Sequence, residues 1–123
     1  MDQKYRSLNA YKESKELVKQ VYRLLKKFPK EEQYALCDQL RRAVISVPSN
    51  IAEGMGRYSA KEQVHFLEIA FGSLMEVSAL MDVACDLQYI SSNELALIDK
   101  NVEGVAALLS GLRSKRVEMG VNH

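Results

Sequence analysis

The sequence contains few residues that interrupt helices. Its 123 residues include two prolines, six glycines and no tryptophan. The remainder is rich in Leu, Ala, Glu, Lys and Arg, which all favour helices. Cysteine and histidine are also scarce, with two of each, which limits the nucleophilic and metal-binding sites that can be built. The composition favours an all-helical protein.

An excess of charge of one sign is also lacking. Lys and Arg number 17 against 16 Asp and Glu, so the formal net charge is +1. Without a global positive field, nucleic-acid binding would require local basic clusters or several chains acting together. The polar N-terminus lacks the apolar stretch of a signal peptide. The nine uncharged residues from Gly104 to Leu112 are too few to cross a bilayer. We therefore expect a cytoplasmic protein that makes no membrane contact.

Four amphipathic segments account for most of the chain. Apolar residues recur every three or four positions, the helical period, over about 4–27, 30–54, 60–88 and 92–117. Short connections between long helices force neighbours to run antiparallel. The sequence therefore predicts one domain over 1–123, an all-α, antiparallel up-down-up-down four-helix bundle. The residues after Val117 are expected to fray.

Local signals place the helix ends. Pro48 lies inside the second segment, where it should bend the helix. The pair Gly54 and Gly56 is expected to end that segment through a left-handed conformation. Two capping boxes, Ser59–Glu62 and Ser91–Glu94, open the third and fourth helices. The apolar stripe of the second segment comprises Tyr34, Cys37, Leu40, Val44, Val47 and Ile51.

The two cysteines are expected to stay free thiols. If the second and third helices turn near Tyr58, Cys85 lies roughly 9 Å along the axis from the level of Cys37. A disulfide needs Cα atoms within about 7 Å. Nothing in the sequence therefore indicates an oxidising compartment.

Catalytic and metal-binding patterns are incomplete. A di-metal bundle site uses two Glu-x-x-His motifs, and this chain has one, Glu62 to His65. His123 is the only other histidine, so no nucleophile–histidine arrangement is plausible. We expect His65 to be a surface or subunit-contact residue. The sequence predicts no catalytic residue, no metal and no cofactor.

A polar stripe runs beside the apolar one on the second helix. Its members, spaced by three or four, are Gln39, Arg42, Ser46, Asn50, Glu53 and Arg57. The stripe could be a solvated face, a buried or inter-subunit polar network, or a ligand-contacting surface, and we favour the network. Antiparallel pairing places Glu76 within about one turn of Arg42. An Arg42–Glu76 pair would fix the register of the two helices more than it would add stability.

Basic residues gather at one end of the predicted bundle. This basic end holds the second turn and both chain termini, with Lys4, Arg6, Arg57, Lys61, Arg113, Lys115 and Arg116. The last three also complement the dipole at the end of the fourth helix, which would suffice to explain them. In a symmetric ring the candidates Arg57, Lys61, Arg113, Lys115 and Arg116 would form a positive rim for phosphates. Without interleaved aromatic residues, phosphate contact is favoured over base stacking.

Several motifs carry a resemblance to a known family. They are Gln39-Leu-Arg-Arg-Ala43, Ser46-Val-Pro-Ser-Asn-Ile-Ala-Glu-Gly54, Phe66-Leu-Glu-Ile-Ala70 and Gly72-Ser-Leu-Met-Glu76. With them the whole chain resembles the four-helix-bundle proteins encoded in intervening sequences of bacterial 23S ribosomal RNA genes. Ala35 and Gln88 stand where such proteins would lead us to expect glycine, and Phe71 where a basic residue is common.

The resemblance implies a function that the residues alone do not. It implies a homopentameric ring and a similarity to the accessory variability protein of diversity-generating retroelements, which is thought to bind nucleic acid and a reverse transcriptase. It brings no catalytic residues. We therefore expect a non-enzymatic homo-oligomer, a nucleic-acid or ribonucleoprotein accessory module whose partners are itself, RNA or DNA phosphates and a nucleic-acid-handling protein. The alternative is a protein-binding scaffold with no nucleic-acid role. Met55 and Phe71, beside the core stripes, are candidate interface residues.

Overall fold

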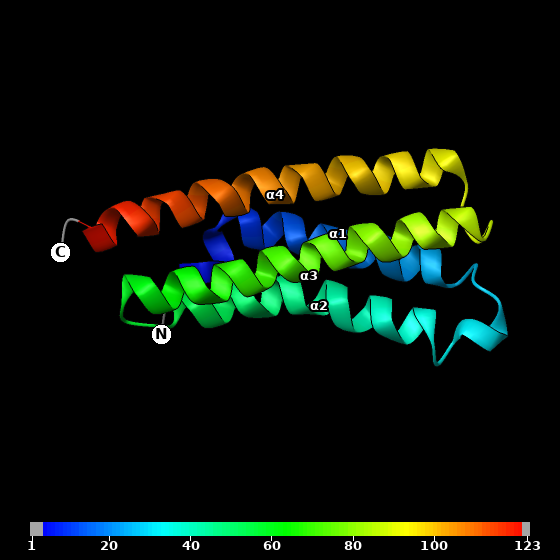
Figure 1. Ribbon diagram of the computed structural model, residues 1–123, viewed down its shortest axis with the longest axis horizontal. Coiled ribbons are helices and arrows are strands. Elements are labelled where there is room, and N and C mark those ends of the chain that lie inside the picture. Colours follow the sequence, from blue (N-terminus) through cyan, green and yellow to red (C-terminus); the bar gives the residue numbers. More distant parts are fainter. Residues whose placement is uncertain (1–3, 122–123) are drawn as a thin grey trace.

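The computed structural model describes residues 4–121, in which four long helices lie side by side (Figure 1). They are α1 (Asn9–Leu25), α2 (Leu36–Met55), α3 (Ala60–Asp86) and α4 (Ser92–Val121), with short 3-10 helices η1 (Lys4–Ser7) and η2 (Lys30–Glu32). Each long helix packs on its neighbours in the sequence, and α1 also packs on α4. Consecutive helices alternate in direction. This arrangement confirms the all-α, up-down-up-down four-helix bundle.

The helix ends differ from the predicted ones in three places. The first predicted helix is divided, because Leu8 has an extended backbone between η1 and α1. The second begins at Leu36, not at residue 30, because Ala35 has φ −119° and ψ −100°, outside the helical region. The fourth continues past Val117 to Val121. Its last turn packs on α3, since a Cβ at Gly120 would lie 3.4 Å from the Cβ of Ala60.

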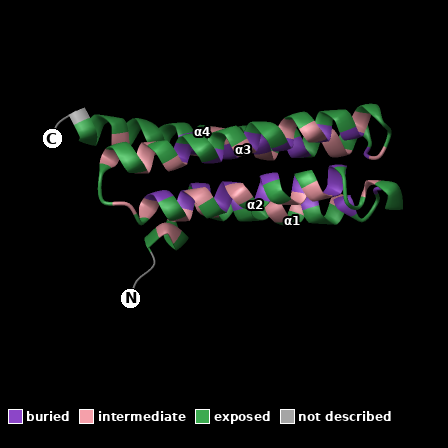
Figure 2. Ribbon diagram, turned by 60° about the horizontal axis from the view of Figure 1, so that its bottom comes forward, coloured by how far each residue is buried: buried purple, intermediate pink, exposed green. Residues whose placement is uncertain are grey.

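The core is an apolar layer between the helices. Buried residues of α2 and α3 face the space between the α1–α2 and α3–α4 pairs (Figure 2). The largest fully buried side chains include Leu17, Leu40, Ile51, Leu67, Leu74, Met81, Ile98 and Leu109. Each contributes roughly 1.5–3 kcal/mol by leaving water. The predicted stripe of α2 is buried except for Tyr34, which is 89% exposed because it lies in the non-helical segment before Leu36.

Both predicted N-terminal caps form. The Ser59 hydroxyl accepts a hydrogen bond from the Glu62 amide at 3.1 Å. At α4 the box is reciprocal, since the Glu94 amide donates to the Ser91 hydroxyl at 3.1 Å and the Ser91 amide donates to the Glu94 carboxylate at 2.9 Å. Such caps satisfy amides that have no partner within the helix.

The glycines at the end of α2 have a different role from the predicted one. None of the described glycines has a positive φ. Gly54 is buried inside α2, and a Cβ there would lie 3.0 Å from the Cβ of Phe66 and 3.3 Å from the Gln63 carbonyl oxygen. The glycine therefore lets α3 approach α2 closely.

The left-handed conformation occurs instead at Gln88, after α3, with φ 65°. The Tyr89 amide there donates to the Ala84 carbonyl at 2.9 Å, which closes the end of α3. Glycine would adopt this conformation without a steric cost. The left-handed backbone at residue 88 thus explains why the family resemblance leads us to expect glycine at the position before Tyr89.

Pro48 and the cysteines occupy buried or half-buried positions. Pro48 is buried, and α2 continues as a helix through it; the bend predicted there stays a prediction. Cys37 and Cys85 are free thiols, as predicted. Burial raises the pKa of the Cys37 thiol above its ordinary value, with a smaller opposing effect of Arg41, so Cys37 is a poor nucleophile at neutral pH.

Candidate nucleic-acid interface

Arg57 follows α2 at the basic end of the bundle. Its guanidinium lies 4.7 Å from the Phe66 ring centroid, and its Nη2 is 3.3 Å from a Glu53 carboxylate oxygen. Cation–π contact and an exposed ion pair are both weak interactions. Within the described part of the chain, the buried Nε of Arg57 has no hydrogen-bond partner. The half-buried Arg57 side chain is therefore held only by weak contacts.

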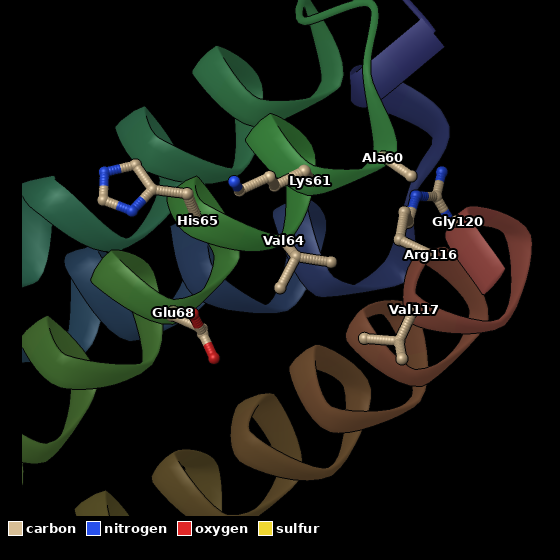
Figure 3. Close-up of a pocket in the computed structure, with 8 residues that line it drawn as sticks. All are labelled: Ala60, Lys61, Val64, His65, Glu68, Arg116, Val117 and Gly120. Atoms are coloured by element: carbon tan, nitrogen blue, oxygen red, sulfur yellow. The ribbon is translucent and has the colours of Figure 1, made fainter.

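Arg116 lies across from the start of α3. It lines an open hollow of about 460 Å³ together with Lys61, His65 and Glu68 of α3 (Figure 3). Its Nη2 donates to the Met55 sulfur at 3.5 Å, and a thioether is a weak acceptor. Among residues 4–121 its buried Nε finds no acceptor either. Lys61 and Arg116 are thus the two predicted cations that the fold brings into one hollow.

The other two candidates are placed differently. Arg113 forms an ion pair with Glu68 on α3, with Nη2 and Nε at 2.8 and 3.0 Å from one carboxylate oxygen, and its charge is therefore largely compensated. Lys115 lines a separate hollow between α1 and α4, beside Leu8 and Leu112. The predicted rim is consequently divided between two faces of the basic end.

The predicted polar stripe is a network only at its centre. The hydroxyls of Ser46 on α2 and Ser73 on α3 lie 2.8 Å apart, and the Asn50 amide donates to both the hydroxyl and the carbonyl oxygen of Ser46 at 2.8 Å. All three are half-buried between the helices. Of the remaining members, Gln39, Arg42 and Glu53 are exposed and Arg57 is half-buried, and the proposed partner Glu76 is exposed.

The predicted Arg42–Glu76 pair is wrong. The Arg42 side chain is 81% exposed, and its Nη2 lies 3.3 Å from a carboxylate oxygen of Asp38. Asp38 is one turn earlier on the same helix, where an i, i+4 partner lies within reach without crossing to α3. The solvated-face interpretation therefore describes this end of the stripe.

The sequence reasoning missed a third hollow, between η1, α1 and α2. It has a volume of about 500 Å³ and is lined by Tyr5, Tyr11, Lys15, Lys19, Ile45 and Ser49 among others; we call it the tyrosine groove. The spacing of Tyr11, Lys15 and Lys19 by four is the signal that could have revealed this mixed aromatic and basic face.

His65 is an exposed surface residue and does not belong to a metal-binding cluster among residues 4–121. Its ring packs on Phe66 with centroids 5.4 Å apart and an interplanar angle of 72°. Within residues 4–121, no group of three or more His, Cys, Asp and Glu is arranged to hold a metal ion.

Four large apolar side chains of α3 are partly exposed. Ile69, Phe71, Met75 and Val83 are each between 38% and 46% exposed. By length and composition alone α3 could cross a membrane, a test that core helices of soluble proteins also pass. Met55 is half-buried, in contact with the core and with Arg116.

These features define a class: a small four-helix bundle with cations at one end and partly exposed apolar side chains on α3. The family model described as 23S rRNA-intervening sequence protein matches residues 6–111, and the chain belongs to this family. The resemblance found in its motifs is thereby confirmed.

A solved structure supports the same fold. It is a protein of unknown function from the S23 ribosomal protein family of Bacteroides thetaiotaomicron, with a TM-score of 0.78 and 19% identity over 85% of this chain and 97% of that one. At this identity the likeness supports the fold alone. None of the curated proteins matches the sequence.

Proposed function

We propose that this chain is a non-enzymatic, cytoplasmic module that assembles with copies of itself and binds RNA or DNA through phosphates at its basic end. The observation that carries the proposal is the state of Arg57 and Arg116, whose Nε atoms are buried and have no acceptor within residues 4–121. An unpartnered buried donor costs free energy. Either side chain can therefore turn toward a phosphate oxygen without losing a hydrogen bond at Nε.

The surroundings of these two arginines favour an anionic ligand. Lys61 is exposed in the first turn of α3, where the positive end of the helix dipole adds to its charge. The Glu68 carboxylate, the acidic group in the same hollow, is compensated by Arg113. Phosphate oxygens accept strong hydrogen bonds from guanidinium groups. Arg57, Lys61 and Arg116 should therefore contribute more to binding than Arg113 and Lys115.

Two features support the proposed self-association. A single chain with a net charge of +1 has little long-range attraction for nucleic acid, so several basic ends must act together. The exposed apolar side chains of α3 offer a surface that a second copy could cover. The family resemblance implies five copies in a ring. Phe71, partly exposed beside Leu109 and Arg113 of α4, is the residue we expect at the interface.

A bilayer is a less suitable partner for α3. Glu68, Glu76 and Asp82 are all exposed on the same helix, and carboxylates within a membrane span are costly. A protein surface can leave these groups in water at the edge of the contact, whereas the hydrocarbon layer cannot.

Salt dependence tests the nucleic-acid proposal. If about six phosphates are contacted, raising salt from 50 to 200 mM should weaken binding on the order of 10³-fold. Reversing two charges, Arg57→Glu with Arg116→Glu, should abolish binding of a labelled oligonucleotide while the oligomer stays intact. A matched control reverses Arg23 and Lys30, both exposed and far from the basic end, for an equal change in charge. Binding that survives the first double reversal, or that ignores salt, would refute the proposal.

Oligomerisation is measured separately. Light scattering at micromolar concentration should return about five times the 13.9 kDa mass of one chain. Phe71→Glu should reduce this mass, because a buried interface does not tolerate an unpaired carboxylate. A monomer mass for the parent protein would contradict the proposed assembly.

The exposed face of α3 also supports a second candidate function, a protein-binding scaffold without a nucleic-acid role. In that case a pull-down with nuclease treatment should retain the same protein partners, and the Arg57 and Arg116 reversals should have no effect on them.

A further inference from the structure

The tyrosine groove combines aromatic rings with cations. The η1 segment packs on both α1 and α2, so that Tyr5 lies against Tyr11 with ring centroids 4.9 Å apart and planes at 75°. Both rings are partly exposed. The opposite wall, from α2, is formed by neutral residues such as the exposed Ile45 and Ser49. The groove thus has an aromatic side and an apolar side.

The charges at this groove are positive. The Lys15 ammonium lies 5.1 Å from the Tyr11 ring centroid, and the Arg6 guanidinium lies 5.8 Å from that of Tyr5. Lys19 also lines the groove, and its pair with Glu16 is exposed on both sides, so that it contributes little and is easily exchanged. Of the described residues that line the groove, none is acidic.

This pattern matches the chemistry of a single-stranded nucleic acid. Bases stack on aromatic rings whatever their sequence, and phosphates follow nearby Lys and Arg side chains. Exposed cation–π contacts are weaker than the stacking of a base on an aromatic ring. A base can therefore displace the Lys15 ammonium from Tyr11, and the ammonium is then available to the adjacent phosphate. A double helix hides the faces of its bases and cannot use the groove in this way.

We propose that the tyrosine groove binds a single-stranded segment of RNA or DNA, with one base on Tyr11 or Tyr5 and the flanking phosphates on Lys15 and Lys19. This inference rests on the proposed function and deepens it, since the basic end alone would contact phosphates without regard to the bases. The groove makes the protein selective for single strands.

The experiment compares three probes of equal length: an oligothymidylate of about 12 nucleotides, within the usual site size, its abasic analogue, and the same sequence in a duplex. The protein has no tryptophan and six tyrosines, so intrinsic fluorescence reports on tyrosine directly. We expect tighter binding of the oligothymidylate than of either other probe, with tyrosine quenching only for the oligothymidylate.

Tyrosine variants locate the effect. Tyr11→Leu should weaken oligothymidylate binding about tenfold, as loss of one base stack does, and leave abasic binding unchanged, whereas Tyr11→Phe should bind like the parent. Because Tyr11 also packs on the core, its replacement could disturb the fold. Tyr5 lies outside the four long helices, so Tyr5→Leu is a second variant for which we expect the same loss of oligothymidylate binding. Tyr34→Leu, at the opposite end and fully solvated, is the matched control.

The lysines give an independent readout. Lys15→Gln with Lys19→Gln should weaken binding of both single-stranded probes and lower the salt slope by about two. Equal affinity for oligothymidylate and abasic probe, or parent-like binding by Tyr5→Leu and Tyr11→Leu, would overturn the inference. If the Arg57 and Arg116 reversals still abolish binding in that case, the proposed function stands without it. No binding of any probe would overturn both.

Discussion

The two ends of the bundle use their polar side chains differently. At the end that holds the α3–α4 turn, the Lys27 ammonium lies 2.6 Å from the Glu94 carboxylate, and the Tyr89 hydroxyl donates to Glu32 at 2.8 Å. Arg41 donates to the Gln33 carbonyl at 2.8 Å in the same region. At the basic end, Arg57 and Arg116 have buried donors without acceptors among the described residues.

The comparison separates two uses of a polar group. Paired groups join segments far apart in the sequence, as Lys27 and Glu94 join the end of α1 to the start of α4, and so they hold the fold together. Unpaired donors lower stability and are therefore useful mainly for what they can bind. At the basic end Arg113 and Glu68 join α4 to α3 in the same way, and under the proposed function the Nε atoms of Arg57 and Arg116, without an acceptor within residues 4–121, are the donors left for a ligand.

The largest stability effect is expected at the basic end. Gly54→Leu should destabilise the fold by about 3 kcal/mol, because a Cβ there would lie closer than van der Waals contact to the Phe66 side chain and the Gln63 backbone. Gly104→Ala is the control, because a Cβ at this position has no neighbour within 4 Å. Since alanine favours a helix more than glycine does, this variant should be more stable than the parent by about 1 kcal/mol. Chemical denaturation measures both. Equal stability of the two variants would mean that α2 and α3 do not approach closely at Gly54.

A smaller effect is expected at the other end. Gln88→Gly should stabilise the protein by about 1 kcal/mol, because φ at residue 88 is 65° and a side chain in this region costs roughly that amount. Thermal unfolding of the variant should show a raised midpoint. Gln88→Ala keeps the Cβ and should show no such gain; a gain there would point to the glutamine side chain instead of the backbone.

The Glu94 carboxylate should make this end sensitive to acid. Its hydrogen bond with Lys27, and then that with the Ser91 amide, hold its pKa below the ordinary 4.5. A lowered folded-state pKa means that the stabilisation is present above 4.5 and is lost as the pH falls through the lowered value. Glu94→Gln should flatten the pH dependence of unfolding in that window, whereas Glu103→Gln, exposed on the same helix, should not. An unchanged profile in Glu94→Gln would contradict this assignment.

The smallest effect is expected at Arg42. Because Arg42 pairs with Asp38 at the surface, Arg42→Ala should cost less than about 0.5 kcal/mol. A loss of about 3 kcal/mol would instead indicate a buried partner, as in an inter-subunit contact. Unfolding measured over a range of protein concentrations distinguishes the two, because only an inter-subunit contact would make the loss depend on concentration.

Much of the fold could be predicted from local patterns. The helical period identified four helices, and the serines at 59 and 91 marked two starts, because these signals act within one or two turns. The late start of α2 was missed, since nothing in the composition of residues 30–35 forbids a helix. Its cause is the backbone turn at Ala35.

The candidate site was predicted less well, for a geometric reason. Counting residues along antiparallel helices gives the end at which a side chain lies, which holds for Lys61 and Arg116. It does not give the rotation of each helix, and so Lys115 was grouped with residues of another face. The tyrosine groove depends on η1 folding back onto α1 and α2, a tertiary contact with no local signal.

The helices of the bundle differ in length, and this has a consequence at the basic end. With 30 residues α4 is about 45 Å long, whereas α1 with 17 is about 26 Å. Since Lys115 lies level with the start of α1, the turns of α4 from Arg116 onward extend beyond its partner (Figure 1). α1 is therefore absent beside these last turns of α4, and their contact is with the start of α3, where Arg116, Val117 and Gly120 line a hollow together with Ala60 and Lys61.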